Sequence, residues 1–215
     1  MPQLRSPRIW GTLATSGGVG ATTLTLHLAQ VASRSGVRTL LIESDLRAPL
    51  REILPSAPPF WEEYQGQSSI PERALPRPLA TGFALLTRRS AGEIKPELYR
   101  ELIEIASENF DLILIDQPMI HLEQINPLLV LENSLPSLIG LNVLAPIYKP
   151  QIVVINKFSP RLKKRPAIQG FITDAHTFKV PKSEDLQLAL GYGITRKLTA
   201  KNEQLFNTVL AEILN

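Results

Sequence analysis

A glycine-rich loop near the start of the chain has the residue types of a phosphate-binding site. Its sequence is Ser16-Gly17-Gly18-Val19-Gly20-Ala21-Thr22-Thr23. In the usual pattern, G-x-x-x-x-G-K-[ST], backbone N–H groups hold the phosphates, the lysine reaches the β- and γ-phosphates, and the hydroxyl binds Mg²⁺. Here Ala21 stands at the lysine position and Thr15 at that of the first glycine. The loop is therefore predicted to hold a nucleotide without being well equipped to cleave it.

Two aspartates that follow apolar strands are candidates for binding Mg²⁺ together with Thr22. Asp116 ends the apolar run 112–115, and Asp45 lies three residues beyond the run 37–42. Hydroxyl and carboxylate oxygens are the ligands that Mg²⁺ prefers. The Asp45 carboxylate could also orient a water molecule toward a terminal phosphate, so Asp45 is the candidate catalytic residue, with Glu43 a weaker one. The structural alternatives are a turn or cap aspartate for Asp45 and a solvated strand end for Asp116.

The elements around these residues predict a parallel sheet. Residues 9–14 form a predicted strand, 22–35 an amphipathic helix and 37–42 a second strand. This order requires a right-handed crossover, which places the loop at the carboxyl edge of the sheet. Further strands are predicted at 83–87, 112–115, 128–131, 152–155 and 178–180, and helices at 96–109, 134–142, 184–190 and 201–214. Such apolar strands are buried on both faces, so we expect a three-layer α/β fold with a mainly parallel sheet and helices on both faces.

Length and composition fit one globular domain over residues 1–215. Of the 215 residues 44% are hydrophobic and 20% charged, and the formal net charge is +3. An irregular, proline-rich excursion is expected at about 55–80. The absence of cysteine excludes disulfides, cysteine metal sites and thiol nucleophiles. No apolar run approaches the roughly 20 residues that span a bilayer and no signal-peptide core follows the N-terminus, so a cytoplasmic location is expected.

The order and spacing of several segments resemble those of the ParA/MinD-type deviant Walker ATPases. These segments are the loop, Glu43-Ser44-Asp45-Leu46, the stretches 110–118 and 153–157, and the stretch 180–185. The resemblance implies a P-loop NTPase fold, bound ATP and Mg²⁺, and a homodimer that forms on ATP binding. It implies that Asp45 positions the attacking water and the magnesium, and that Asp116 is the Walker B residue. It also implies that Asn156 contacts adenine and that Pro181 borders the base.

The family's second lysine is also missing. In the family this signature lysine stands at the start of the loop and crosses the dimer to the partner's phosphates, but here that position is Ser16. Losing one preorganised oxyanion donor costs about 10²–10³ in rate, so hydrolysis is expected to be very slow or dependent on a partner. Candidate replacement cations are Arg47, Arg51 or a residue of a second subunit, the alternative being that both arginines are surface residues.

The loop with Ala21 and the segment 133–138 look most like the CpaE/TadZ branch, which helps to localise and assemble Tad-type pili. We therefore expect an ATP-binding switch that organises such an assembly, cytoplasmic or peripheral at a pole or the inner membrane through partner proteins. One alternative is a pseudo-ATPase scaffold. Another is a DNA-partition ATPase, suggested by the basic run Arg161, Lys163, Lys164 and Arg165. The terminal helix lacks a basic stripe and is expected to pack against the sheet.

Overall fold

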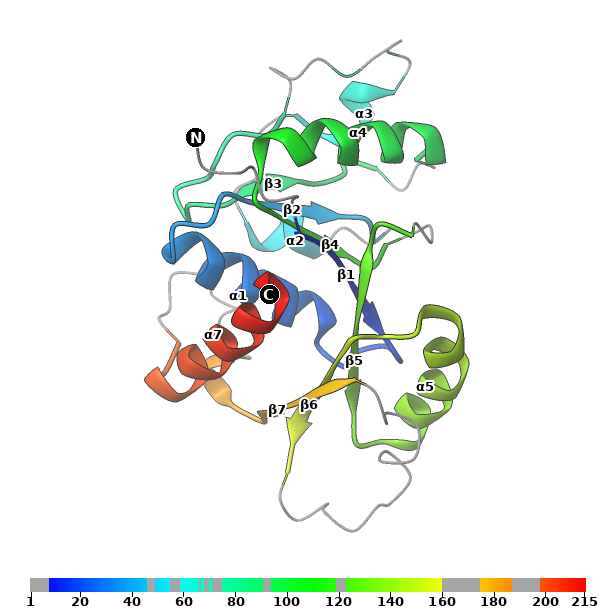
Figure 1. The fold of residues 1–215 in the computed structure, drawn as a ribbon, viewed down its shortest axis with the longest axis vertical. Coiled ribbons are helices and arrows are strands. Elements are labelled where there is room, and N and C mark those ends of the chain that lie inside the picture. Colours follow the sequence, from blue (N-terminus) through cyan, green and yellow to red (C-terminus); the bar gives the residue numbers. More distant parts are fainter. Residues whose placement is uncertain are drawn as a thin grey trace.

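Seven parallel strands form one sheet at the centre of the molecule (Figure 1). The computed structural model describes residues 8–45, 49–54, 59–65, 67, 70, 75–90, 94–118, 123–159, 175–186 and 198–215. The strand order is β3-β2-β4-β1-β5-β6-β7. The strands are β1 (Arg8–Ala14), β2 (Thr39–Glu43), β3 (Ala84–Leu86), β4 (Leu112–Asp116), β5 (Asn126–Glu132), β6 (Ile152–Phe158) and β7 (His176–Pro181).

Helices cover both faces of this sheet, which confirms the predicted three-layer α/β fold. They are α1 (Ala21–Arg34), α2 (Pro49–Ile53), α3 (Trp61–Tyr64), α4 (Pro96–Asn109), α5 (Leu135–Tyr148) and α7 (Ala200–Leu214). Side chains alternate along β4, so that Leu112 and Leu114 pack with α1 and α7, whereas Ile113 and Ile115 pack with α4. The helix α5 covers the same face as α4, over the half of the sheet formed by β1, β5 and β6. None of the helices in the described ranges is long and apolar enough to cross a membrane.

The terminal helix α7 lies beside α1 (Figure 1) and packs into the core, as the sequence predicts. Trp10 of β1 donates its indole N–H to the carbonyl oxygen of Ile213 at 3.2 Å. The ring of His27 in α1 meets that of Phe206 in α7, with 5.4 Å between the ring centroids. The two helices are thus joined to each other and to the central strand.

Two proline-containing segments differ from their predicted structures. The helix predicted at 134–142 continues to Tyr148, with Pro146 inside it. Pro146 has no N–H to donate to the carbonyl of residue 142, but it lies on the exposed side of α5, where water can take that hydrogen bond. In the proline-rich segment predicted as irregular, the short helix α3 forms where Trp61 stacks on Tyr99 at 5.4 Å between ring centroids. The predicted helix at 184–190 is described only to residue 186.

The buried imidazole of His27 leads to a prediction about acid stability. Burial lowers the pKa of His27 to about 4. The unfolded chain therefore binds the proton first, and stability is lost as the pH falls from about 6.5 toward 4. In His27→Leu, we expect the free energy of unfolding to fall by about 3 kcal/mol less than in the wild type between pH 6.5 and pH 4. Urea unfolding across that pH range measures this difference.

The variant Leu28→Ala is the control for this experiment. Leu28 is fully buried in the same helix and does not titrate, so its truncation should lower stability equally at every pH. Parallel pH profiles for the wild type and His27→Leu would contradict the assignment.

Candidate nucleotide-binding site

The glycine loop is open on one side and closed on the other. Gly18 and Gly20 have φ angles of +75° and +88°, which are strained for residues with a Cβ. A Cβ on Gly20 would also overlap Nδ2 of Asn156, whereas a Cβ on Gly17 or Gly18 would meet nothing within 4 Å. The backbone of Gly17 and Gly18 thus borders open space, while that of Gly20 is held against β6.

The loop leads directly into the N-terminus of α1. The N–H of Leu24 donates to the carbonyl oxygen of Gly20 at 3.0 Å, which begins the helix. Within the described part of the chain, no side chain caps this N-terminus and its first turn holds no acidic residue. Its backbone N–H groups and the positive end of the helix dipole therefore favour an anion in front of the loop.

A row of three polar side chains crosses the sheet beneath α1. Thr12 of β1, Asp116 of β4 and Glu43 of β2 are paired in register at the carboxyl edge, and all three are buried. Oγ1 of Thr22, in the first turn of α1, donates to Oδ2 of Asp116 at 2.7 Å. The predicted partners Thr22 and Asp116 are thus brought together, and we name Thr12, Asp116 and Glu43 the polar row.

The polar row has the donor set of a site for a hard cation. Oγ1 of Thr12 and Oε2 of Glu43 are buried and have no hydrogen-bond partner among the described residues. The pKa of Glu43 is raised to about 7, chiefly by burial; the N–H of Leu50 opposes this rise, and the charges of Asp116 and Asp45 contribute to it. No group of three or more acidic or histidine side chains among the described residues is arranged to hold a metal ion. Hydroxyl and carboxylate oxygens beside a phosphate loop fit Mg²⁺, which completes its shell with water and phosphate oxygens.

Asp45 follows an anchored residue just beyond β2. The N–H of Ser44 donates to the carbonyl of Asp116 at 3.1 Å, and its hydroxyl lies 3.1 Å from the Tyr99 hydroxyl. The buried Arg88 adds a bond of 3.3 Å from Nη1 to the Ser44 carbonyl. Asp45 is therefore held near the polar row and half-buried, while its catalytic role stays a prediction.

Two residues at the end of β6 tie that strand to the loop. Nδ2 of Asn156 donates to the carbonyl of Val19 at 2.7 Å, and Oδ1 accepts from the N–H of Lys157 at 2.9 Å. Nζ of Lys157 donates to the carbonyl of Gly18 at 2.5 Å and lies 3.2 Å from Oε2 of Glu132. Asn156 thus shapes the loop. Lys157 is a further residue of the site, and it was not predicted from the sequence although it directly follows Asn156.

The ends of β6 and β7 and the loop enclose a pocket of about 270 Å³. Gly18, Gly20 and Thr23 line one side of it, and Asn156 and Pro181 line the other. The remaining lining residues are Lys157, Lys182, Ser183 and Leu186. The residues predicted to border a base thus share one pocket with the residues predicted to bind phosphate.

Arg51, one of the predicted replacement cations, does not line this pocket. Nη1 of Arg51 donates to the carbonyl oxygens of Arg88 and Arg89, at 3.3 and 2.5 Å. Arg47 and the basic run at 161–165 lie outside the described residues. Oγ of Ser16, at the position of the family's signature lysine, lies 2.9 Å from Oγ of Ser137 in α5.

Comparisons with known proteins agree with this geometry. Residues 11–195 match the family described as the CobQ/CobB/MinD/ParA nucleotide binding domain. None of the curated proteins matches the sequence. Many solved structures are similar, and those described next are below 25% identity, so they bear on the fold alone.

Three of these structures cover nearly the whole chain. The ParA family ATPase of Chlorobium tepidum is 19% identical with a TM-score of 0.73, covering 98% of this chain and 100% of its own. The MinD cell division protein of Aquifex aeolicus is 19% identical with a TM-score of 0.71, covering 95% and 97%. The ATP complex of Cyanothece McdA is 17% identical with a TM-score of 0.72, covering 97% of each chain.

The bond between Asn156 and Val19 leads to a prediction about the loop. Asn156→Ala leaves the carbonyl of the buried Val19 without its partner, which costs about 1–3 kcal/mol locally. We expect amide exchange at residues 15–20 to become about 5- to 150-fold faster, measured by hydrogen–deuterium exchange with mass spectrometry.

Asn126→Ala is the matched control, because Nδ2 of Asn126 also donates to a backbone carbonyl, that of Ile9 at 3.2 Å, but at the opposite end of β1. It should leave the exchange of the loop unchanged. Equal exchange of the loop in the wild type and Asn156→Ala would show that the bond does not restrain it.

Proposed function

This chain belongs to the CobQ/CobB/MinD/ParA nucleotide-binding domain family, and from that premise we propose that it is a switch that binds ATP with Mg²⁺ at the glycine loop. The observation that carries this proposal is the bond of 2.7 Å from Thr22 to the buried Asp116, directly behind the loop. It joins the hydroxyl and the carboxylate that a phosphate-bound Mg²⁺ needs. The McdA neighbour was solved as a complex with ATP, which supports the same ligand here.

Each part of the site then has a separate role in binding. Backbone N–H groups of the loop 16–20 and of the first turn of α1 bind the phosphates. Thr22 and Asp116 hold Mg²⁺, with Asp45 as a further ligand, and the bound ion neutralises charge on the phosphates. The pocket beside Asn156 and Pro181 takes the base. Because Asn156 also shapes the loop, base and phosphate binding are linked through one side chain.

We propose that hydrolysis is slow or dependent on a partner. Ser16 and Ala21 replace both lysines of the family, and one lost oxyanion donor alone costs about 10²–10³ in rate. Asp45 is the residue that orients the attacking water, because it follows β2 at the same edge as the loop.

The proposed output is the organisation of a cellular assembly. ATP binding promotes a homodimer, and the dimer binds protein partners of an assembly such as a Tad-type pilus, in the cytoplasm or at a pole or the inner membrane. The loop with Ala21 and the segment 133–138, which resemble the CpaE/TadZ branch, support this role. A DNA-partition role rests on the basic run at 161–165 and predicts salt-dependent binding to duplex DNA.

A pseudo-ATPase scaffold is the second candidate function. Arg51 and Lys157 both donate to backbone carbonyls, so each would have to leave these bonds before replacing a missing lysine. A protein whose site never gains such a cation either binds nucleotide without hydrolysing it or functions without nucleotide. Binding and phosphate release therefore have to be measured separately.

For binding, we expect calorimetry to show that Mg²⁺ strengthens ATP binding and that ADP competes. Asp116→Asn keeps an oxygen that can accept from Thr22 but removes the charge, so the affinity in Mg²⁺ should fall about 10- to 100-fold and lose its dependence on Mg²⁺. Asp111→Asn is the matched control, since Asp111 precedes the same strand at the opposite edge and pairs with Arg38. Absence of heat with ATP and Mg²⁺, without competition by ADP, would refute the proposed function.

For turnover, we expect slow release of inorganic phosphate from ATP in a single-turnover assay with enzyme in excess. With enzyme and Mg²⁺ at concentrations that saturate ATP binding, Asp45→Ala should abolish this release, because Asp45 orients the attacking water while Thr22 and Asp116 still hold the ion. Asp111→Asn again serves as the control. If the wild type and Asp45→Ala both release no phosphate above buffer, slow hydrolysis by the chain alone is refuted, which leaves partner-dependent hydrolysis or the scaffold.

A further inference from the structure

Lys157 lies where the regular pairing of β6 breaks down. The register of β6 against β7 shifts between Ile155 and Phe158. Within this stretch Lys157 has a φ of +51°, in the left-handed region that is strained for a residue with a Cβ. Irregularities of this kind re-aim side chains beside functional sites, where the surrounding structure holds the strain. The backbone of β6 is thus distorted at the residue whose side chain reaches the glycine loop.

The ammonium group of Lys157 contacts the loop and keeps a donor in reserve. Nζ donates to the carbonyl oxygen of Gly18 at 2.5 Å and lies 3.2 Å from Oε2 of Glu132, at the end of β5. The Lys157 side chain is only half-buried. Because a lysine ammonium carries three N–H donors on a flexible stem, two partners leave the third donor for a ligand. Lys157 can therefore bind a ligand without leaving the loop.

Lys157 lies on the pocket side of the loop, away from the proposed ion site. It lines the pocket of about 270 Å³ together with Gly18 and Asn156. Thr22 instead donates to Asp116, behind the loop. A nucleotide with its base beside Asn156 and its ion at Thr22 would run its phosphates from the pocket toward Asp116. The phosphate that Lys157 meets is then the one nearest the nucleoside.

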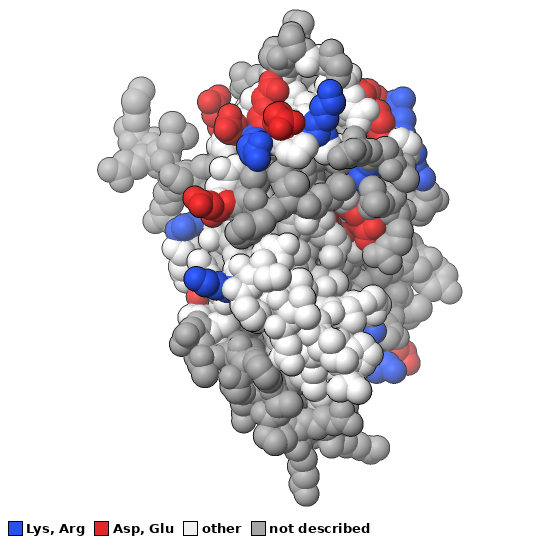
Figure 2. Space-filling view, turned by 90° about the vertical axis from the view of Figure 1, so that its right-hand side faces the viewer, with Lys and Arg blue, Asp and Glu red and all other residues white. Residues whose placement is uncertain are grey.

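The other described elements around the loop bring no positive charge to it. The basic residue of α1 is Arg34, in its last turn. The helix α5, whose Gly140 lies on the carbonyl of Thr15, has no charged side chain, and Figure 2 shows a broad uncharged surface on this side of the molecule. Lys182 also lines the pocket, but it is exposed and bonds to no loop atom in the described ranges. Among the described side chains, Lys157 is therefore the cation in contact with the loop.

We propose that Lys157 supplies part of the positive charge that the loop lacks, and that its ammonium group binds the phosphate nearest the nucleoside. This inference rests on the proposed function, since it needs a nucleotide in the pocket. ATP and ADP both carry this phosphate, so the charge strengthens the binding of both. Such uniform binding raises affinity without accelerating cleavage, which fits a loop with Ala21 at the lysine position.

Chemical restoration of the charge tests this proposal, since the natural chain has no cysteine. Lys157→Cys is alkylated with 2-bromoethylamine, which gives a side chain of the length of lysine with an ammonium group. A second sample is alkylated with iodoacetamide, which gives a neutral amide of similar length. Both side chains have an N–H that can donate to the carbonyl of Gly18, and both come from one purified protein. The two forms therefore differ in charge, and any folding defect of the variant affects them equally.

Calorimetry with Mg²⁺ should show that the ammonium form binds ATP about 10- to 100-fold more tightly than the amide form. This is the range expected for a hydrogen bond between charged groups. The two forms should differ by the same factor in their affinity for ADP. Without nucleotide, amide exchange at residues 15–20 should be equal in both forms, which separates a charge on the ligand from a structural role in the loop.

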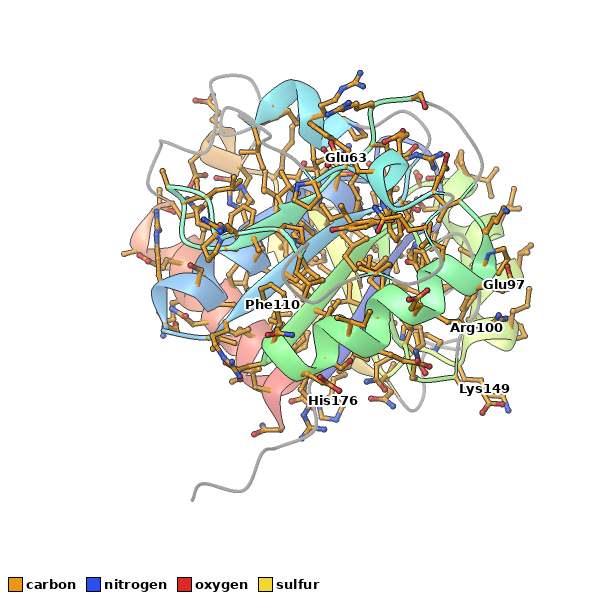
Figure 3. All side chains as sticks on the ribbon, turned by 90° about the horizontal axis from the view of Figure 1, so that it is seen from above. Glu63, Glu97, Arg100, Phe110, Lys149 and His176 are labelled. Atoms are coloured by element: carbon orange, nitrogen blue, oxygen red, sulfur yellow. The ribbon has the colours of Figure 1, made fainter. Side chains whose placement is uncertain are left out.

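Lys149 provides the matched control. It also has a positive φ, of +46°, and carries the same charge. It lies beyond the end of α5 on the outside of the molecule (Figure 3) and does not line the pocket. The two alkylated forms of Lys149→Cys should therefore bind ATP with equal affinity.

Equal affinity of the two Lys157→Cys forms for ATP, when the wild type binds ATP, would overturn the Lys157 proposal and leave the ATP site intact. A difference for ATP without one for ADP would also overturn it, because the charge would then act on the terminal phosphate. A wild type that binds neither nucleotide would instead refute the proposed function, and the inference with it.

Discussion

The hydrogen bond from Thr22 to Asp116 connects the two parts of the site, the loop with α1 and the carboxyl edge of the sheet. Asp116 is fully buried in a strand that lies between β1 and β2, so its position is set by the pairing of three strands. Thr22 stands in the first turn of α1, so the same bond fixes where the helix and the loop before it begin. The geometry of the phosphate site thus follows from the register of the sheet.

The acidic residues of the site favour a divalent cation, which could offset the absence of the family's lysines. Glu43, Asp45 and Asp116 bring negative charge to the edge of the sheet, and the raised pKa of Glu43 reflects burial first and these neighbours second. Ser16 and Ala21 add no positive charge to the loop. On the proposed function, backbone N–H groups and a divalent cation would therefore supply what the lysines supply elsewhere in the family. Such a site would stabilise bound ATP more than the charge that develops during its cleavage.

The sequence predicts the scaffold of the site well, because it depends on periodicity and on the rules of parallel sheets. Strand, loop and helix around residues 9–35 are found as expected, and Thr22 and Asp116 meet because the carboxyl ends of parallel strands share one edge. The direction of Lys157 was not predictable, since its φ of +51° breaks the alternation of the strand. The full length of α5 was missed because Pro146 reads as a helix breaker, yet it lies on an exposed side.

The most direct test of the central claim is a crystal structure of the chain grown with a non-hydrolysable ATP analogue and Mg²⁺ at millimolar concentration. The account predicts phosphates along Gly17 to Gly20, the base beside Asn156 and an ion held by the Thr22 hydroxyl and the Asp116 carboxylate. An empty loop under these conditions would contradict the claim that this site binds ATP.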